Sequence, residues 1–189
     1  RTASETVRRM RKFYRPRDES GFSPVDLNAL IEEAVSVTQP KWKQEASAAG
    51  QYIDLDTELN VASTIYGNES ELHEMLTNLI FNSVDAMPEG GRIVIRTFEE
   101  NGNATIEFSD NGAGMTKETK QKCFDPFYTT KGSAGSGLGL ATLQGIVQRH
   151  DGQVTVESSE GQGTTFRICL PVAQQRETAE ETSEQVQIR

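Results

Sequence analysis

The fold class of this chain of 189 residues is decided by one stretch, Asn78-Leu79-Ile80-Phe81-Asn82-Ser83-Val84-Asp85-Ala86. Asn78, Asn82 and Asp85 are four and three residues apart, so they share one face of a helix. Asparagine is a poor helix former, and a solvated helix face usually carries Lys and Glu instead. An amide oxygen suits Mg²⁺ that is bound together with nucleotide phosphates. The stretch therefore predicts a helix with a functional polar face.

The elements around this stretch define the fold. The helix is predicted to start at the capping box Asn68-Glu69-Ser70-Glu71 and to end before Pro88. Its predicted buried residues are Leu72, Met75, Leu76, Leu79, Ile80 and Val84. Alternating apolar residues predict strands over 52–59, 64–66, 92–98, 104–109, 153–158 and 164–170. Two further helices are predicted over 2–14 and 138–150. Another is predicted to start after Ser23, with Ser23 as its N-cap and Pro24 at its first position. This order predicts an α/β two-layer sandwich with a mixed sheet and helices on one face, preceded by a short helical segment.

Composition limits the possible functions. A formal charge of −9, with 35% hydrophobic and 25% charged residues, is typical of a soluble globular domain. No apolar run reaches the roughly 18 residues that cross a bilayer, and there is no signal-peptide pattern. We therefore expect no membrane segment in this fragment and a cytoplasmic location, whether or not the parent protein is membrane-anchored. The two cysteines, Cys123 and Cys169, suit a reducing compartment. Outside the basic residues 1–18 the chain is strongly acidic, so we expect no nucleic-acid partner.

Three further motifs place glycine and polar residues where a core element would be apolar. The first, Asp110-Asn111-Gly112-Ala113-Gly114-Met115, follows a predicted strand, and its carboxylate can accept a hydrogen bond from the exocyclic amine of adenine. Guanine has an oxo group there, and mispairing would cost roughly 1–3 kcal/mol. The second is Phe124-Asp125-Pro126-Phe127-Tyr128-Thr129-Thr130-Lys131, in which Thr129, Thr130 and Lys131 can donate hydrogen bonds to phosphate. The third, Gly135-Ser136-Gly137-Leu138-Gly139-Leu140, precedes a predicted helix whose free N–H groups favour phosphate oxygens.

Together and in this order, the four motifs resemble the ATP-binding catalytic domain of bacterial sensor histidine kinases. That family shares a superfamily with gyrase, the MutL repair proteins and heat-shock chaperone ATPases. The resemblance spans about residues 22–171, and Gly163-Thr164-Thr165-Phe166 is similar to the closing strand of the family. It implies the Bergerat-type ATP-binding fold, with ATP between the asparagine-bearing helix and a mobile lid over about residues 127–138.

The resemblance also implies roles for individual residues. Asn82 would coordinate Mg²⁺, Asp110 would bind the adenine amino group, and Thr165 would support Asp110 through a hydrogen bond or a water. Asn78, Asn82 and Lys131 would be the catalytic residues. The full set expected to contact ATP and Mg²⁺ is Asn78, Asn82, Asp85, Asp110, Gly112, Gly114, Met115, Thr129, Thr130, Lys131, Gly135, Ser136, Gly137, Leu138, Gly139, Leu140 and Thr165.

One position separates the kinases from the hydrolases of the superfamily. Hydrolases carry a Glu four residues before the metal-binding Asn, where it activates water. Here that residue is Asn78, and Glu74 lies eight residues before Asn82, so the sequence favours a kinase. His73-Glu74 imitates the phosphoacceptor motif of the family, but Leu79 replaces its proline. We interpret His73 as a surface or packing residue and His150 as structural.

The resemblance implies a domain organisation in which the acceptor histidine is missing. Residues 1–15 would be the C-terminal end of a dimerisation and phosphoacceptor hairpin, and residues 16–23 a linker. Residues 24–171 would be the catalytic domain, and residues 172–189 a polar tail or linker. The implied partners are the hairpin of the parent protein, expected to be a homodimer, and a response-regulator receiver domain whose Asp takes the phosphoryl group. Autophosphorylation is not expected without the hairpin.

Two other functions stay open at this point. ATP could regulate association with a protein partner without turnover, because binding residues alone do not prove catalysis. An anti-sigma-type serine kinase shares the fold, although it does not usually have the helical segment expected at 1–15.

Overall fold

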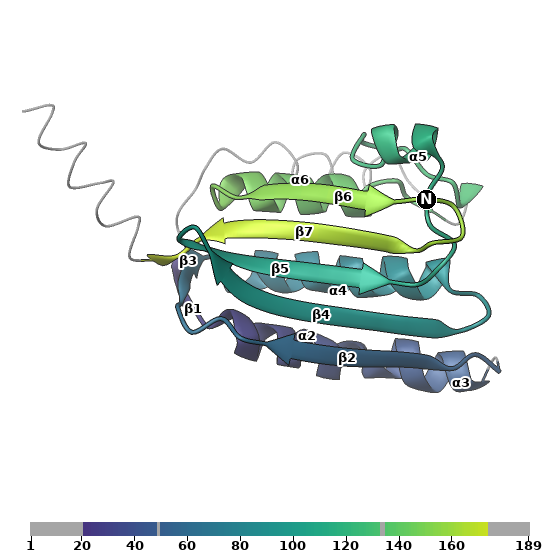
Figure 1. The fold of residues 1–189 in the computed structure, drawn as a ribbon, viewed down its shortest axis with the longest axis horizontal. Helices are drawn as coiled ribbons and strands as arrows, with labels where there is room; N and C mark the ends of the chain where they lie inside the picture. The colour runs from purple at the N-terminus through teal and green to yellow at the C-terminus, as the bar shows by residue number, and fades with distance from the viewer. Residues whose placement is uncertain (1–20, 49, 133–134, 174–189) are drawn as a thin grey trace, which may run out of the picture.

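The computed structural model describes residues 21–48, 50–132 and 135–173, which form two layers (Figure 1). The order of strands in its five-stranded sheet is β2 (Ile53–Leu59), β4 (Gly91–Glu100), β5 (Asn103–Asp110), β7 (Thr164–Pro171) and β6 (Gln153–Ser158). β2 pairs with β4 in parallel, and all other neighbours are antiparallel. The predicted mixed sheet is therefore confirmed.

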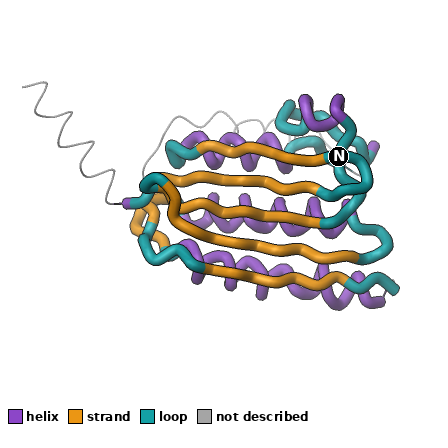
Figure 2. The backbone as a smooth tube through the Cα atoms, viewed as in Figure 1, coloured by secondary structure: helices purple, strands orange, loops and turns teal. Residues whose placement is uncertain are grey.

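Three long helices cover one face of this sheet (Figure 2). They are α2 (Leu27–Gln39), α4 (Glu69–Ala86) and α6 (Gly139–Arg149), and α4 contacts both of the others. Shorter elements are a π-helical turn (Pro40–Glu45), α3 (Ala46–Ala48), α5 (Lys117–Lys122), and a two-stranded sheet of β1 (Ser23–Val25) and β3 (Ile65–Gly67). The α/β sandwich with helices on one face is confirmed, whereas the sequence did not predict the π-helical turn, α3 or α5.

The core lies between α4 and the sheet. All six residues predicted to form the inner face of α4 are buried, and Ile93, Ile95, Ile106, Phe108 and Ile168 of the sheet are fully buried opposite them. Burying one such side chain contributes about 1.5–3 kcal/mol. This packing fixes the rotation of α4, and hence the direction in which its polar residues point.

The start of α2 differs from the prediction. Ser23 is not its N-cap, because Ser23–Val25 pairs antiparallel with Ile65–Gly67. The N-cap is Asp26, whose carboxylate accepts from the backbone N–H groups of Asn28 and Ala29, each at 3.0 Å. Pro24 is compatible with this arrangement, because a proline can occupy an edge strand.

His150 has the structural role predicted for it. It is buried at the end of α6, and its Nε2 accepts from the backbone N–H of Asn68, the N-cap of α4, at 2.9 Å. Its ring also stacks on Phe22, with the centroids 4.8 Å apart. His150 thus connects the C-terminal end of α6 to the N-terminal end of α4.

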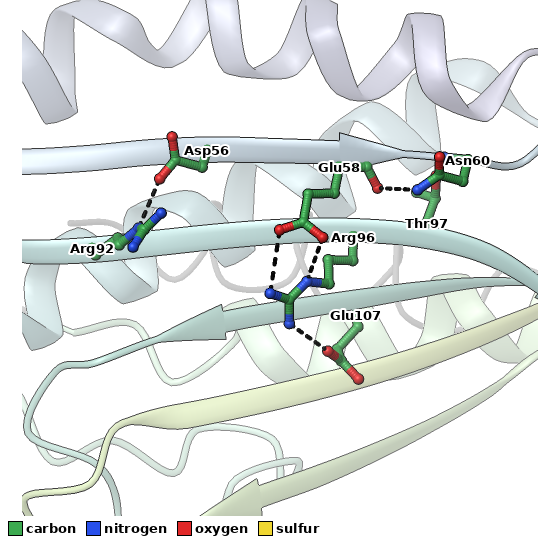
Figure 3. A network of polar contacts seen from close by, with 7 residues as sticks. All are labelled: Asp56, Glu58, Asn60, Arg92, Arg96, Thr97 and Glu107. Atoms are coloured by element: carbon green, nitrogen blue, oxygen red, sulfur yellow. Dashed lines mark hydrogen bonds and ion pairs between the residues drawn. The ribbon is translucent and has the colours of Figure 1, made fainter.

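The other face of the sheet carries paired charges (Figure 3). Nε of Arg96 lies 2.9 Å from Glu58, and its Nη1 lies 3.5 Å from Glu107. Nε of Arg92 lies 2.7 Å from Asp56. The hydrogen bond from Arg96 lowers the pKa of Glu58. Solvent-exposed pairs of this kind contribute little to stability, so this face is a solvated surface.

Some predictions fall outside the described residues. They are the helix over 2–14, the boundary between residues 1–15 and the linker, and the tail from residue 174 onward. Within residues 21–48, 50–132 and 135–173, no helix combines the length and apolar character needed to span a membrane.

Candidate functional site

The C-terminal half of α4 contacts two other segments that carry predicted site residues. On one side, the hydroxyl of Ser83 donates to Oδ2 of Asp110, at the end of β5, over 2.8 Å. On the other side, Nδ2 of Asn82 lies 3.5 Å from the place that a Cβ of Gly139 would take, at the start of α6. Consecutive residues of one helix thus reach the end of β5 and the start of α6. Residues predicted for both ends of a nucleotide site therefore contact this one helical turn.

Asp110 is a buried carboxylate with an incomplete set of hydrogen bonds. Its Oδ1 accepts from the backbone N–H of Gly112 at 2.9 Å, and its Oδ2 accepts from Ser83. Burial raises the pKa of Asp110, while the hydrogen bonds from Gly112, Ser83 and the backbone of Thr164 oppose the shift. Each carboxylate oxygen has two acceptor lone pairs, so capacity remains for one more donor. An exocyclic amine can supply that donor.

The glycines after Asp110 are required by close backbone contacts. The position of a Cβ on Gly112 would lie 2.7 Å from the carbonyl oxygen of Ala86, at the end of α4, which also accepts from the N–H of Ala113 at 2.9 Å. Gly114 has φ +67°, and a Cβ there would overlap the carbonyl oxygen of Ser159. The loop after β5 is therefore held closely against α4 and the β6–β7 hairpin.

Gly163, which belongs to that hairpin, gives a first prediction. It has φ +78°, and a Cβ there would overlap the carbonyl oxygen of Asp110. Gly163→Ala should therefore lower the free energy of unfolding by more than the roughly 1–3 kcal/mol of backbone strain alone. The matched control is Gly161→Ala, because Gly161 has φ +71° but no heavy atom within 4 Å of the added Cβ. Urea unfolding of both variants checks this, and equal losses would contradict a role for the overlap.

The structure corrects the expected contact of Thr165 with Asp110. In the β5–β7 ladder Thr164 is opposite Asp110, and Thr165 is opposite Ser109. Successive residues of a strand point to opposite faces. The hydroxyl of Thr165 accordingly lies 2.9 Å from Oγ of Ser109, on the face away from the helices. The residue of this strand that supports Asp110 is Thr164.

A backbone hydrogen bond joins the two ends of the predicted lid. The N–H of Phe127 donates to the carbonyl of Gly137 at 2.8 Å, and both residues have positive φ, 68° and 63°. Nζ of Lys131 lies 2.7 Å from Oδ2 of Asp85 on α4. The lysine is thus directed at the polar face of α4, where Asn82 also lies, although residues 133–134 between these segments are not described.

The other predicted lid residues make local contacts. Oγ1 of Thr129 accepts from the N–H of Lys131 at 3.1 Å, and Gly135 is packed against the Thr129 side chain. Thr130 is exposed. Oγ of Ser136 accepts from the N–H of Leu138 at 3.4 Å. These residues supply hydroxyl groups and backbone amides in the segment that leads to the start of α6.

The N-terminus of α6 has no side-chain cap. Leu138 is its N-cap residue and makes no capping hydrogen bond, and the helix starts at Gly139. Free N–H groups at a helix start, with the helix dipole, favour an anion. Leu140 packs against the core, so only its backbone is suited to contact a phosphate. Met115 also packs against the core, beyond the Asp110 loop.

Sequence reasoning missed Ser83. It is 2% exposed, and among the residues that the structure describes it is the only polar residue of α4 that is buried as a whole, although the hydroxyl oxygen of the partly exposed Thr77 is buried too. A signal for it was present, because Ser83 follows Ile80 by three residues and so interrupts the apolar stripe of the helix. A buried hydroxyl in such a stripe requires a partner, and here the partner is Asp110.

Comparisons with known proteins agree with this geometry. The family described as "Histidine kinase-, DNA gyrase B-, and HSP90-like ATPase" matches residues 67–174. The signal transduction histidine-protein kinase AtoS of Escherichia coli (strain K12) is 37% identical over 171 residues, which cover 89% of this chain but only 27% of AtoS. The chain thus spans about a quarter of the length of that relative.

Solved structures give the same result. The nucleotide-free catalytic domain of the histidine kinase ThkA superposes with a TM-score of 0.68 at 27% identity, covering 80% of this chain and 97% of that domain. Full-length ShkA, solved in complex with AMPPNP, superposes with a TM-score of 0.75 at 25% identity. That match covers 89% of this chain and 35% of ShkA. The predicted fold is thus the fold of known histidine kinase catalytic domains.

Proposed function

The chain belongs to the family of histidine kinase-, DNA gyrase B- and HSP90-like ATPases, and from that premise we propose that it binds Mg-ATP and donates the γ-phosphoryl group to a histidine on a dimerisation hairpin. A nitrogen of that imidazole forms a bond to the γ-phosphorus, the bond to the oxygen bridging to the β-phosphate breaks, and ADP leaves. The phosphoryl group then passes to an Asp of a response-regulator receiver. In this scheme the domain works as the ATP-binding half of a sensor histidine kinase.

One observation carries the proposal. Asn82 and Ser83, adjacent on α4, reach the uncapped start of α6 and the buried carboxylate of Asp110 respectively. A carboxylate acceptor suits the adenine amine, and a free helix start suits phosphate oxygens. A nucleotide lying across this turn of α4 would satisfy both groups at once.

The proposal includes a role for Mg²⁺. The described residues contain no group of three His, Cys, Asp or Glu side chains able to hold a metal. Mg²⁺ usually binds through one or two protein oxygens, substrate phosphates and water, so the amide oxygen of Asn82 beside the start of α6 fits this ion. When bound, Mg²⁺ would supply positive charge at the phosphates.

Transfer to a protein group is favoured over hydrolysis by the residue at position 78. Asn78 lies one turn before Asn82 on the same face of α4, and an amide cannot take a proton from water as a carboxylate can. The chain's own groups would therefore hold and orient ATP until a nucleophile arrives. Lys131 would offset the charge of the transferred group.

Calorimetric titration with a nonhydrolysable ATP analogue, with and without Mg²⁺, tests the binding step. Micromolar-range binding that Mg²⁺ strengthens is the expected result. Adding a purified hairpin domain and radiolabelled ATP then tests transfer, with the label expected on the hairpin histidine. Absence of binding would contradict the proposal, and binding without transfer would favour a module that ATP only regulates.

Lys131 gives a second prediction. Its ammonium group pairs with Asp85, on the face of α4 where we place the phosphates. Lys131→Ala should therefore weaken ATP binding by about tenfold, which is about 1.4 kcal/mol. Adenosine binding should not change, because adenosine has no phosphate. Lys117→Ala on α5 is the control, since that lysine is exposed and lies outside the site. Competition titrations with ATP and adenosine measure the difference, and equal losses for both ligands would contradict the assignment.

A further inference from the structure

Ser83 connects α4 directly to the carboxylate that we assign to adenine. It is 2% exposed, and its hydroxyl donates to Oδ2 of Asp110 at 2.8 Å from a position 27 residues away in the chain. Ser83 itself was not predicted as a site residue. Its neighbour Asn82 faces the phosphate end, so the same helical turn serves both ends of the site.

Three hydrogen bonds hold the Asp110 carboxylate, two from the backbone of Gly112 and Thr164 and one from the side chain of Ser83. Gly112 donates to Oδ1 at 2.9 Å and Ser83 donates to Oδ2. Because the two donors approach different oxygens, rotation of the carboxylate would break both bonds. The Gly112 donor is a backbone N–H and cannot be removed by substitution of a side chain. Ser83 is therefore the side chain through which this orientation is controlled.

We propose that Ser83 is a positioning residue that holds the Asp110 carboxylate as an acceptor for the exocyclic amine of a 6-aminopurine nucleotide. This inference rests on the proposed function. It adds Ser83 as the residue that positions Asp110, and Asp110 in turn selects adenine over 6-oxopurines and over purines that lack the amine. Ser83 acts through Asp110 and needs no contact with the nucleotide.

The charge state of Asp110 supports this role. Burial raises its pKa, and the hydrogen bond from Ser83 is one of the three that oppose the shift. Among the described residues, no charged side chain is a cause of the shift. A protonated Asp110 would present an O–H donor to the donor amine of adenine. A hydrogen bond that keeps Asp110 ionised therefore also keeps the site selective for adenine.

Ser109 offers a matched control. It also carries a hydroxyl bonded to another side chain, 2.9 Å from Thr165, and it directly precedes Asp110 on β5. Its side chain lies on the opposite face of the sheet from that of Asp110. Ser109→Ala therefore removes an equivalent hydroxyl beside Asp110 without removing a bond to the carboxylate.

The test measures the affinity of a nonhydrolysable ATP analogue and of purine riboside triphosphate, which lacks the amine, across a range of pH. Ser83→Ala should weaken ATP-analogue binding about tenfold at neutral pH and leave the purine compound nearly unchanged. The acid midpoint of the ATP-analogue affinity should move to higher pH. Ser109→Ala should match the wild type in all three respects.

A second variant separates the hydrogen bond from packing. Ser83→Cys keeps the shape of the side chain but supplies only a weak donor, so it should behave as Ser83→Ala does. An unchanged preference for ATP and an unchanged acid midpoint in both variants would overturn the inference. A wild-type chain that fails to bind the ATP analogue would instead overturn the proposed function.

Discussion

Asp110→Asn is expected to weaken binding of an ATP analogue by about 100-fold at neutral pH. In the wild type both carboxylate oxygens accept from protein donors, the N–H of Gly112 and the hydroxyl of Ser83. An asparagine amide has one acceptor and one donor group. The backbone N–H of Gly112 can only donate, so the amide oxygen must face it. The amide NH₂ then faces Ser83 and the ligand, and it meets the donor amine of adenine.

The size of the effect follows from burial. A mispaired polar group in a desolvated site costs about 1–3 kcal/mol, and the upper end corresponds to about 100-fold. Calorimetric titration measures it. Asp56→Asn is the matched control, because this aspartate pairs with Arg92 on the exposed face of the sheet, away from the site. Equal affinities for the wild type and Asp110→Asn would contradict the assignment of Asp110 to the adenine amine.

The pH dependence of stability and that of binding should have opposite signs at Asp110. Its pKa is raised by burial, so the folded state holds the proton more tightly than the unfolded state does. Its contribution to stability is full below the unfolded-state pKa and is lost as the pH rises through the raised folded-state pKa. Binding needs the ionised carboxylate, so ATP affinity should fall as the pH drops through that same raised pKa. Unfolding and titration series over pH, each compared with Asp110→Asn, would show both trends.

Much of the fold could be predicted from the sequence because local patterns and tertiary packing agree there. The apolar stripe of α4 is long, regular and buried throughout, and the Asn101-Gly102 turn lies between β4 and β5 as expected. Prediction failed at Ser23, where a serine followed by proline is an equally good helix start on its own. Pairing with β3, a partner about 40 residues away, decides that segment as a strand.

The site shows the same division. The prediction of Asp110, the glycine loop and Asn82 as site residues rests on motifs, because their chemistry is visible in single residues. The error at Thr165 was one of register, since a shift of one residue along a strand moves a side chain to the other face. Neither this register nor the contact between Ser83 and Asp110 is encoded by local spacing. Both depend on how β7 and α4 pack against β5.

Asn82→Ala is expected to lower phosphotransfer to a supplied hairpin domain by about 100-fold, the loss typical of removing one stabilising group from a charged transition state. The amide of Asn82 lies beside the uncapped start of α6, where we place the phosphates. Its loss should weaken ATP-analogue binding strongly in the presence of Mg²⁺ and little in its absence.

Measuring binding with and without Mg²⁺ distinguishes a metal-binding role of Asn82 from a packing role. Asn103→Ala is the control, because Asn103 begins β5 on the hairpin at the far end of that strand from Asp110. Asn82→Asp restores an oxygen ligand at the same position, so it should recover part of the Mg²⁺-dependent affinity that Asn82→Ala loses. An equal loss with and without Mg²⁺ would show that Asn82 acts by packing against α6. Ser83 is adjacent to Asn82, but its hydroxyl bonds Asp110, so Ser83→Ala should leave the Mg²⁺ dependence intact. This result would separate the adenine end of the site from its phosphate end.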